Sequence, residues 1–283
     1  MYYTLYYRNY MKSCNYTCPY CPFSKRKVSK EQMKKDKKYM EKFMNFLKNS
    51  HKKFNVFLAP KGEILTFDYY KEIIAQISHF NNIGEIVVQT NLSSDLQWLK
   101  DVNRDKLILW TTYHPEQVEH TDFLKQVNRL VDNHIKFTVG VVGIKENFKE
   151  IKEMKVSLNQ LGKNKPYFWI NAYKDIKNYY TNQDIQFLKE IDKLFEINLK
   201  DYPSIDANCK AGNHTFFVEW NGMVHRCWQD KKVLGNIYRD DLDDISMESR
   251  CRKKVCSCFI GYSHMENLNL DKIYKNSLLG RTP

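Results

Sequence analysis

The stretch Cys14-Asn-Tyr-Thr-Cys18-Pro-Tyr-Cys21, near the start of the 283-residue chain, decides how the sequence is interpreted. Its three cysteines have C-x3-C-x2-C spacing, and Pro19 and Pro22 disfavour a helix through them. In a loop, thiolates so close in sequence can converge on one metal centre. Cysteine thiolates are the ligands of iron–sulfur clusters. A four-iron cluster with only three protein ligands keeps one iron open for another molecule.

Composition and hydropathy place the chain among ordinary globular proteins. Hydrophobic residues make up 42% and charged residues 28%, which excludes wholesale disorder. No run of 18 apolar residues occurs, and the N-terminus lacks the pattern of a signal peptide. We therefore expect a cytoplasmic protein without membrane contact. There, clustered thiols stay reduced and serve as metal ligands or catalysts rather than in disulfides.

Two simpler interpretations of the first cysteine group remain open. Cys18 and Cys21 alone would suit a glutaredoxin-like dithiol, although this leaves Cys14 without a role. A structural zinc site could use all three thiolates and a fourth ligand.

The C-x3-C-x2-C motif, with Tyr20 before its last cysteine, resembles the signature of the radical S-adenosylmethionine (SAM) enzymes. The resemblance implies that Cys14, Cys18 and Cys21 hold a [4Fe-4S] cluster whose open iron is chelated by SAM. One electron from such a cluster cleaves SAM to a 5′-deoxyadenosyl radical, which abstracts hydrogen from a substrate.

Strand and helix patterns alternate through the first two thirds of the chain, which predicts an α/β fold with a parallel sheet. Six such units resemble the partial (β/α)6 TIM-like barrel of the radical SAM enzymes. The predicted strands are Tyr2–Tyr10, Asn55–Ala59, Ile86–Gln89, Leu107–Trp110, Phe137–Val142 and Tyr167–Asn171. The clearest predicted helices are Ser29–Leu47, with a capping box at Ser29 and Gln32, Asp68–Phe80, Phe123–Val131 and Asp184–Phe195.

Residues that follow these strands are candidates for SAM binding, because active residues of such barrels lie at the carboxyl ends of strands. Lys61-Gly62-Glu63 resembles the family's "GGE" element, with a lysine in place of the first glycine. The resemblance implies that Gly62 and Glu63 receive the amino group of SAM. Thr112 and Tyr113 occupy the place of the ribose-binding motif. The remaining candidates are Asn91 near substrate or SAM, and Gly143, Asn171 and Tyr173 near the adenine.

The other five cysteines lie beyond residue 208. Two strand-like runs flank Asn221-Gly222, the strongest short hairpin signal. Such a hairpin folds Cys227 back toward Cys209.

The C-x12-G-x4-C spacing that ends at Cys227 resembles the opening of SPASM and twitch domains, which hold auxiliary iron–sulfur clusters. Five cysteines allow one auxiliary [4Fe-4S] cluster, which favours the shorter twitch type. Cys209, Cys227, Cys256 and Cys258 are the expected ligands. Cys251 is then the spare thiol, either a hydrogen donor to a product radical or inert. It replaces Cys256 as a ligand if Cys256 and Cys258 are too close in sequence to bind the same cluster. A zinc site from the same cysteines is the alternative.

The sequence therefore predicts a radical SAM barrel over residues 1–200 and a small α+β, cysteine-rich, twitch-like domain over residues 201–283, similar to a bacterial family of short radical SAM proteins. The expected substrate is a peptide or a small natural-product precursor. Residues 25–53 hold twelve Lys or Arg and three acids, so they can dock an acidic flavodoxin or ferredoxin that delivers the electron. RNA modification, which the net charge of +12 allows, and a zinc or redox binding module are the alternatives.

Overall fold

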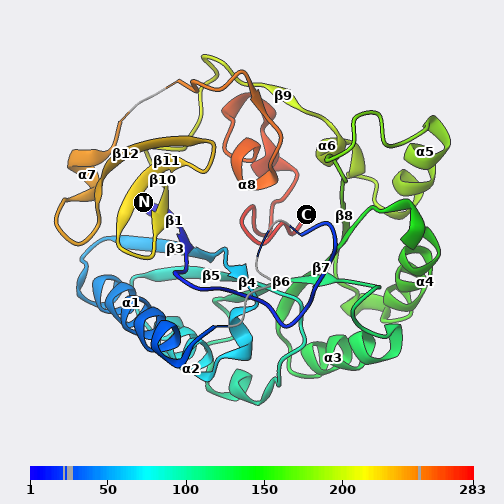
Figure 1. Ribbon diagram of the computed structural model, residues 1–283, viewed down its shortest axis with the longest axis horizontal. Coiled ribbons are helices and arrows are strands. Elements are labelled where there is room, and N and C mark those ends of the chain that lie inside the picture. Colours follow the sequence, from blue (N-terminus) through cyan, green and yellow to red (C-terminus); the bar gives the residue numbers. More distant parts are fainter. Residues whose placement is uncertain (22, 24–27, 248–249) are drawn as a thin grey trace.

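The computed structural model describes residues 1–21, 23, 28–247 and 250–283. Pro22 and the first three basic residues of the segment 25–53 lie outside these ranges. Within them, the largest sheet has nine strands in the order β12-β11-β10-β1-β3-β5-β6-β7-β8 (Figure 1). These strands are β1 (Tyr2–Arg8), β3 (Lys53–Leu58), β5 (Ile83–Thr90), β6 (Leu107–Tyr113), β7 (Lys136–Val142), β8 (Phe168–Asn171), β10 (Thr215–Glu219), β11 (Met223–Cys227) and β12 (Asp230–Asn236).

Helices follow most of the parallel strands, as the α/β pattern predicts. The α-helices are α1 (Lys30–Asn49), α2 (Asp68–Ser78), α3 (His120–Asp132), α4 (Phe148–Asn159), α5 (Asn182–Ile191), α6 (Phe195–Leu199), α7 (Leu242–Ile245) and α8 (Phe259–Tyr262). Short 3-10 helices span Ile64–Thr66, Gln97–Asp101, Lys145–Asn147, Gly162–Asn164, Glu266–Leu268 and Leu270–Lys272. Small two-stranded sheets join β2 (Lys12–Ser13) with β4 (Lys61–Gly62) and β9 (Tyr202–Pro203) with β13 (Val255–Cys256).

The six predicted strands are confirmed as β1, β3, β5, β6, β7 and β8, which pair in parallel in that order. The predicted helix Asp184–Phe195 is divided, because α5 ends at Ile191. The Asp192 carboxylate accepts hydrogen bonds from the backbone N–H of Leu194 (2.9 Å) and Ile170 (2.9 Å). These bonds turn the chain at the point where the helical pattern would continue.

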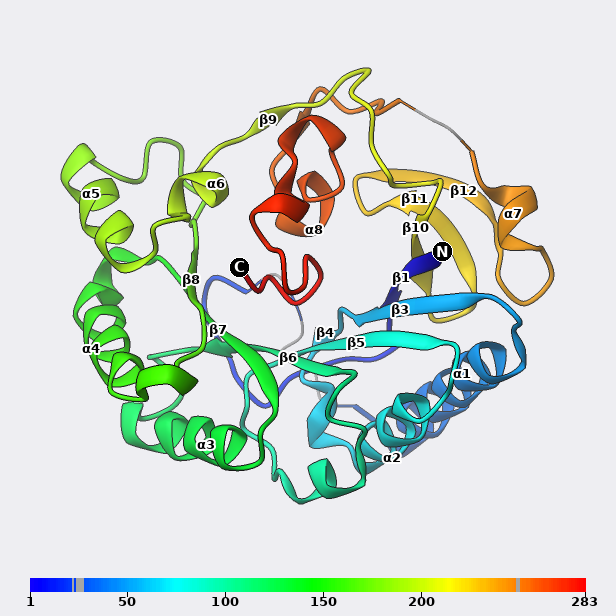
Figure 2. The ribbon, with the colours of Figure 1, turned by 180° about the vertical axis from the view of Figure 1, so that it is seen from behind.

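The sheet curves, and its two faces pack against different partners. Leu5 and Tyr7 of β1 face the outer helices, and the Tyr7 ring stacks on Phe43 of α1 at 4.2 Å between centroids. Tyr6 faces the other way, as side chains alternate along a strand. Helices α1–α4 lie outside the curve, whereas α8 and the C-terminal segment lie inside it (Figures 1 and 2). The result is an α/β partial barrel.

Aromatic residues of the C-terminal segment fill the inside of the barrel. Phe259 packs against Trp110 of β6 with 5.4 Å between ring centroids, and Tyr262 and Tyr274 are buried in the same cluster. Gly140 of β7 makes room for this layer, because a Cβ there would lie 2.1 Å from the Trp169 ring. The barrel interior is therefore a packed core that residues from both ends of the chain complete.

The C-terminal strands continue the barrel sheet. β10 pairs in parallel with β1, so that Arg8 lies beside Glu219, and β11 and β12 follow as antiparallel strands. The predicted hairpin is confirmed, with Gly222 at a φ of 86° that favours glycine. The domain boundary near residue 200 stays a prediction.

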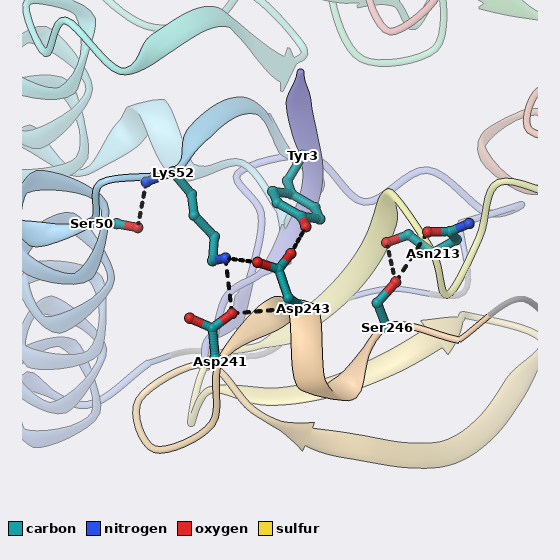
Figure 3. Close-up of polar contacts among 7 residues, drawn as sticks. All are labelled: Tyr3, Ser50, Lys52, Asn213, Asp241, Asp243 and Ser246. Atoms are coloured by element: carbon teal, nitrogen blue, oxygen red, sulfur yellow. Dashed lines mark hydrogen bonds and ion pairs between the residues drawn. The ribbon is translucent and has the colours of Figure 1, made fainter.

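Polar contacts also tie the α7 region to the beginning of the barrel (Figure 3). Tyr3 of β1 donates to Asp243, and Lys52 pairs with both Asp243 and Asp241, the latter at 2.9 Å. The Lys52 ammonium lowers the pKa of each aspartate. Ser246 donates to the backbone carbonyl of Asn213 at 3.0 Å.

Helix α1 carries a buried carboxylate that organises the segment after β1. The helix begins with the predicted capping box of Ser29 and Gln32. Farther along, Asp36 accepts from the backbone N–H of Tyr10 and Met11, both at 2.9 Å, and is 1% exposed. The hydroxyls of Tyr69 (2.7 Å) and Tyr70 (2.6 Å) donate to its other oxygen. Asp36 thus joins α1, α2 and the chain that leads into the cysteine motif.

We expect Asp36→Asn to lower the free energy of unfolding by about 3 kcal/mol, because the amide nitrogen would face two of the four donors and a bond to a charged group contributes ~1.5–3 kcal/mol. Urea unfolding followed by circular dichroism measures the change. Asp105→Asn, at an exposed site, is the control and should change stability by less than about 0.5 kcal/mol. Equal unfolding curves for the two variants would contradict the role of Asp36.

Candidate functional site

A cavity of about 240 Å³ opens at the carboxyl ends of the barrel strands. The chain crosses this edge after β1, β3, β5 and β6, which brings together residues far apart in sequence. The predicted site residues that line the cavity are Cys14, Cys18, Cys21, Gly62, Glu63, Asn91 and Thr112. All three thiols of the first cysteine group therefore face one space.

The loop that follows β5 holds one side of the cysteine motif. The Asn91 amide donates to the Asn15 side-chain carbonyl at 3.0 Å and lies 3.9 Å from the Cys14 sulfur. The Asn15 amide in turn donates to Ser93 at 3.0 Å. These bonds orient the first cysteine toward the cavity.

The loop that follows β6 holds the other side of the motif. Gln117 accepts from the Thr17 backbone N–H at 2.8 Å, and His114 Nδ1 lies 2.8 Å from the Tyr20 hydroxyl. The same nitrogen is 3.4 Å from the Cys18 sulfur. Burial lowers the pKa of His114 to about 4, so the ring is neutral at neutral pH. His114 therefore positions the motif, as do Asn15 and Gln117, which the spacing of the cysteines alone did not single out.

The donor chemistry of this cavity fits an iron–sulfur cluster, whose usual ligands are thiolates. Burial raises the pKa of Cys18 to about 11 and that of Cys14 above its ordinary value. Among the described residues, no three His, Cys, Asp or Glu side chains are already arranged as a metal-ion site. Cluster binding would therefore gather the three thiols and release their protons.

Glu63 is buried against the cavity, and its carboxylate organises the adjoining loop. It accepts from the backbone N–H of Leu65 (3.0 Å) and Asn91 (2.5 Å) and from the Thr90 hydroxyl (3.1 Å). Burial outweighs these bonds and raises the pKa of Glu63 to about 7. Gly62, before it, has a φ of 138°, in the region that favours glycine. A carboxylate in this place can accept from an amino group in the cavity.

Four predicted SAM contacts lie outside the cavity lining. Tyr113 packs on Phe123 of α3, with 5.0 Å between centroids, because side chains alternate along β6 and Thr112 takes the inward position. The prediction of a ribose contact for Tyr113 does not fit this orientation. Gly143 and Asn171 meet through a backbone bond of 2.9 Å at the ends of β7 and β8, and Tyr173 follows them. Their proposed contact with adenine stays a prediction.

A second, smaller cavity gathers four cysteines of the C-terminal group, namely Cys209, Cys227, Cys251 and Cys256. Backbone bonds between distant segments produce this arrangement. Cys251 N–H donates to the Ala207 carbonyl at 3.0 Å, and Asp206 N–H donates to the Cys251 carbonyl at 2.7 Å. Burial raises the pKa of Cys256 to about 12. Four thiols around one space fit a cluster with four protein ligands.

This arrangement differs from the predicted ligand set. Cys251, expected as the spare thiol, lines the cavity, whereas Cys258 does not. Cys258 is the N-cap residue of α8, and burial raises the pKa of its thiol although the nearby charges of Arg8 and Lys174 oppose that shift. Cys251 lines the cavity because two backbone hydrogen bonds hold it in register with residues 206–207.

Within the part of the chain that the structure describes, every helix is too short or too polar to cross a membrane.

Comparisons with known proteins agree with this architecture. Residues 209–275 match the family model of SPASM, an iron-sulfur cluster-binding domain. No curated protein matches the chain. Native anSMEcpe with bound AdoMet is 16% identical with a TM-score of 0.56, over 86% of this chain and 80% of that chain.

Two further solved structures share the fold with similar sequence identity and TM-score. Native anSMEcpe with bound AdoMet and Cp18Cys peptide is 15% identical with a TM-score of 0.55, over 86% of this chain and 79% of that chain. Streptococcus suis SuiB bound to S-adenosylmethionine is 14% identical with a TM-score of 0.57, over 88% of this chain and 66% of that chain. The chain therefore shares the fold of these SAM-bound structures, and its residues 209–275 match the model of SPASM, an iron-sulfur cluster-binding domain.

Proposed function

We propose that this protein is a radical SAM enzyme that abstracts hydrogen from a peptide or a small natural-product precursor. The observation that carries the proposal is the convergence of Cys14, Cys18 and Cys21 on one cavity beside Glu63. A [4Fe-4S] cluster held there would supply the electron for reductive cleavage of SAM to methionine and a 5′-deoxyadenosyl radical. The likeness to SAM-bound structures supports the assignment.

The chain's own residues hold and orient the reactants. Cys14, Cys18 and Cys21 are the cluster ligands. Glu63 and Thr112 line the same cavity, where the carboxylate would accept from the amino group of SAM and the hydroxyl would bond to its ribose. His114 and Asn91 keep the cysteine loop in place. The packed apolar interior of the barrel keeps water out from below.

The SPASM domain holds one auxiliary cluster in this proposal. Its ligands are the four cysteines around the second cavity, Cys209, Cys227, Cys251 and Cys256. The match to an iron-sulfur cluster-binding domain supports this set over a zinc site. The auxiliary cluster would accept an electron from a substrate radical.

A peptide is the favoured substrate, because one of the structural neighbours is bound to a peptide. The electron donor would be a flavodoxin or ferredoxin. Lysine side chains on α1 offer it a basic surface close in sequence to the cysteine motif.

Anaerobic reconstitution tests the proposal directly. We expect about eight irons per chain and a reduced EPR signal that shifts when SAM is added, followed by formation of 5′-deoxyadenosine with dithionite as reductant. Cys14→Ala should abolish the shift, whereas a dithiol of Cys18 and Cys21 would survive that change. If the bound metal is zinc and addition of SAM changes no EPR signal, the proposal of a radical SAM enzyme is refuted.

The two contested cysteines can be separated by iron content. We expect Cys251→Ser to lose about four irons per chain and Cys258→Ser to keep about eight, because only Cys251 lines the second cavity. Iron and sulfide analysis after reconstitution measures both variants, with the N-terminal cluster signal as internal control. If Cys258→Ser loses iron and Cys251→Ser does not, the ligand set predicted from the sequence is correct.

SAM affinity should depend on the ionisation of Glu63. With a pKa near 7, the carboxylate is ionised at pH 8 and mostly protonated at pH 6, where it no longer accepts from the amino group. We expect Glu63→Gln to weaken SAM binding about tenfold at pH 8 and hardly at all at pH 6. Equilibrium dialysis of the reconstituted protein gives the ratio of the two dissociation constants. A ratio that is the same at both pH values would exclude the carboxylate as the amino acceptor.

A further inference from the structure

Arg8 ends β1 on the inner side of the barrel, above the packed interior. Tyr6, two residues earlier, belongs to the interior cluster, so Arg8 points to the same side of the sheet. Its guanidinium carbon is 3.5 Å from the ring centroid of Trp228 and 5.3 Å from that of Phe23. Phe23 lines the cavity of the first cysteine group, whereas Trp228 directly follows Cys227. Arg8 therefore lies between the SAM cavity and the SPASM domain.

Two donors at this place lack acceptors. Arg8 Nε and Trp228 Nε1 are both buried and have no hydrogen-bond partner among the described residues. A buried donor without an acceptor costs about 1–3 kcal/mol. Burial lowers the pKa of Arg8 to about 10, so the side chain still carries its charge at neutral pH. A group with negatively charged oxygen atoms would satisfy both donors and the charge of Arg8.

The groups of the protein that face this cation are the thiol of Cys258, whose pKa is raised by burial, and the carboxylate of Glu219. Glu219 lies beside Arg8 in the sheet, but its carboxylate is 3.7 Å from the ammonium of Lys61. Lys61 stands where the related element has its first glycine, and it is half-buried. Two cations therefore share one carboxylate at the edge of the SAM cavity. A local positive charge remains for a ligand to neutralise.

We infer that Arg8 binds a carboxylate of the substrate, with the indole N–H of Trp228 as a second donor, and that the enzyme selects a peptide that presents such a carboxylate at this place. This inference rests on the proposed function and names its substrate class. The guanidinium anchors the substrate between the radical source and the auxiliary cluster. The carboxylate belongs to an acidic side chain or to the chain terminus.

Three small probes separate these sources in the reconstituted protein with SAM bound. N-acetylglutamate α-amide presents a side-chain carboxylate, N-acetylglutamine presents a terminal one, and N-acetylglutamine amide is the neutral control. Ligand-observed NMR gives their dissociation constants without any turnover. We expect one of the acidic probes to bind at least about tenfold more tightly than the neutral one. Equal or absent binding of all three overturns the inference.

Substitutions test whether Arg8 and Trp228 cause the preference for an acidic probe over the neutral one. Arg8→Gln should abolish it, Arg8→Lys should keep part of it, and Trp228→Phe should weaken it about threefold while keeping the aromatic face. Glu219→Gln should strengthen it, because the competing carboxylate is removed, and misfolding cannot produce such a gain. Arg104→Gln, at an exposed site, is the matched control. A preference that persists in Arg8→Gln, or is unchanged in Glu219→Gln, refutes the assignment.

The outcome is independent of the test of SAM chemistry. Formation of 5′-deoxyadenosine by the wild-type protein decides the proposed function, whereas probe binding decides the role of Arg8. A protein that cleaves SAM but shows no carboxylate preference would refute only the second.

Discussion

Strand β1 is paired along both edges and packed on both faces, and the rest of the molecule depends on this constraint. Its edges pair in parallel with β3 and with β10, which comes from the other end of the chain. One face packs on α1 through Tyr7, and the other packs on the C-terminal segment through Tyr6, whose hydroxyl lies 2.7 Å from Nε2 of His264. The cysteine motif follows directly, so its position is inherited from this central strand.

The two cavities are consequences of the same arrangement. Because β10 continues the barrel sheet, the hairpin that it begins carries Cys227 to the side of the barrel. The segment that follows the second group of cysteines then enters the barrel and fills it with Phe259, Tyr262 and Tyr274. The SPASM domain and the barrel thus share one core. A cluster in either cavity would be held by a scaffold that both parts of the chain complete.

Burial governs the electrostatics of these sites more than pairing does. Burial raises the pKa of Glu63 and of the Cys18 thiol and lowers that of His114. The uncharged forms are thus favoured while the cavities are without bound charge. Binding of a cluster, an amino group or a carboxylate would supply the missing partners. The binding surfaces are consequently costly to leave unpaired, which is typical of functional sites.

The amino-acid sequence by itself determined the local features: the C-x3-C-x2-C loop, the alternation of strands and helices, the capping box of α1 and the turn at Gly222. Each depends on residues close together in the chain. Only the tertiary structure decided that Cys251 rather than Cys258 joins the second cavity, that Tyr113 faces α3, and that Arg8 meets Trp228. These depend on strand register and on backbone bonds between segments far apart in sequence, such as that from Cys251 to Ala207. Local spacing carries no information on such contacts.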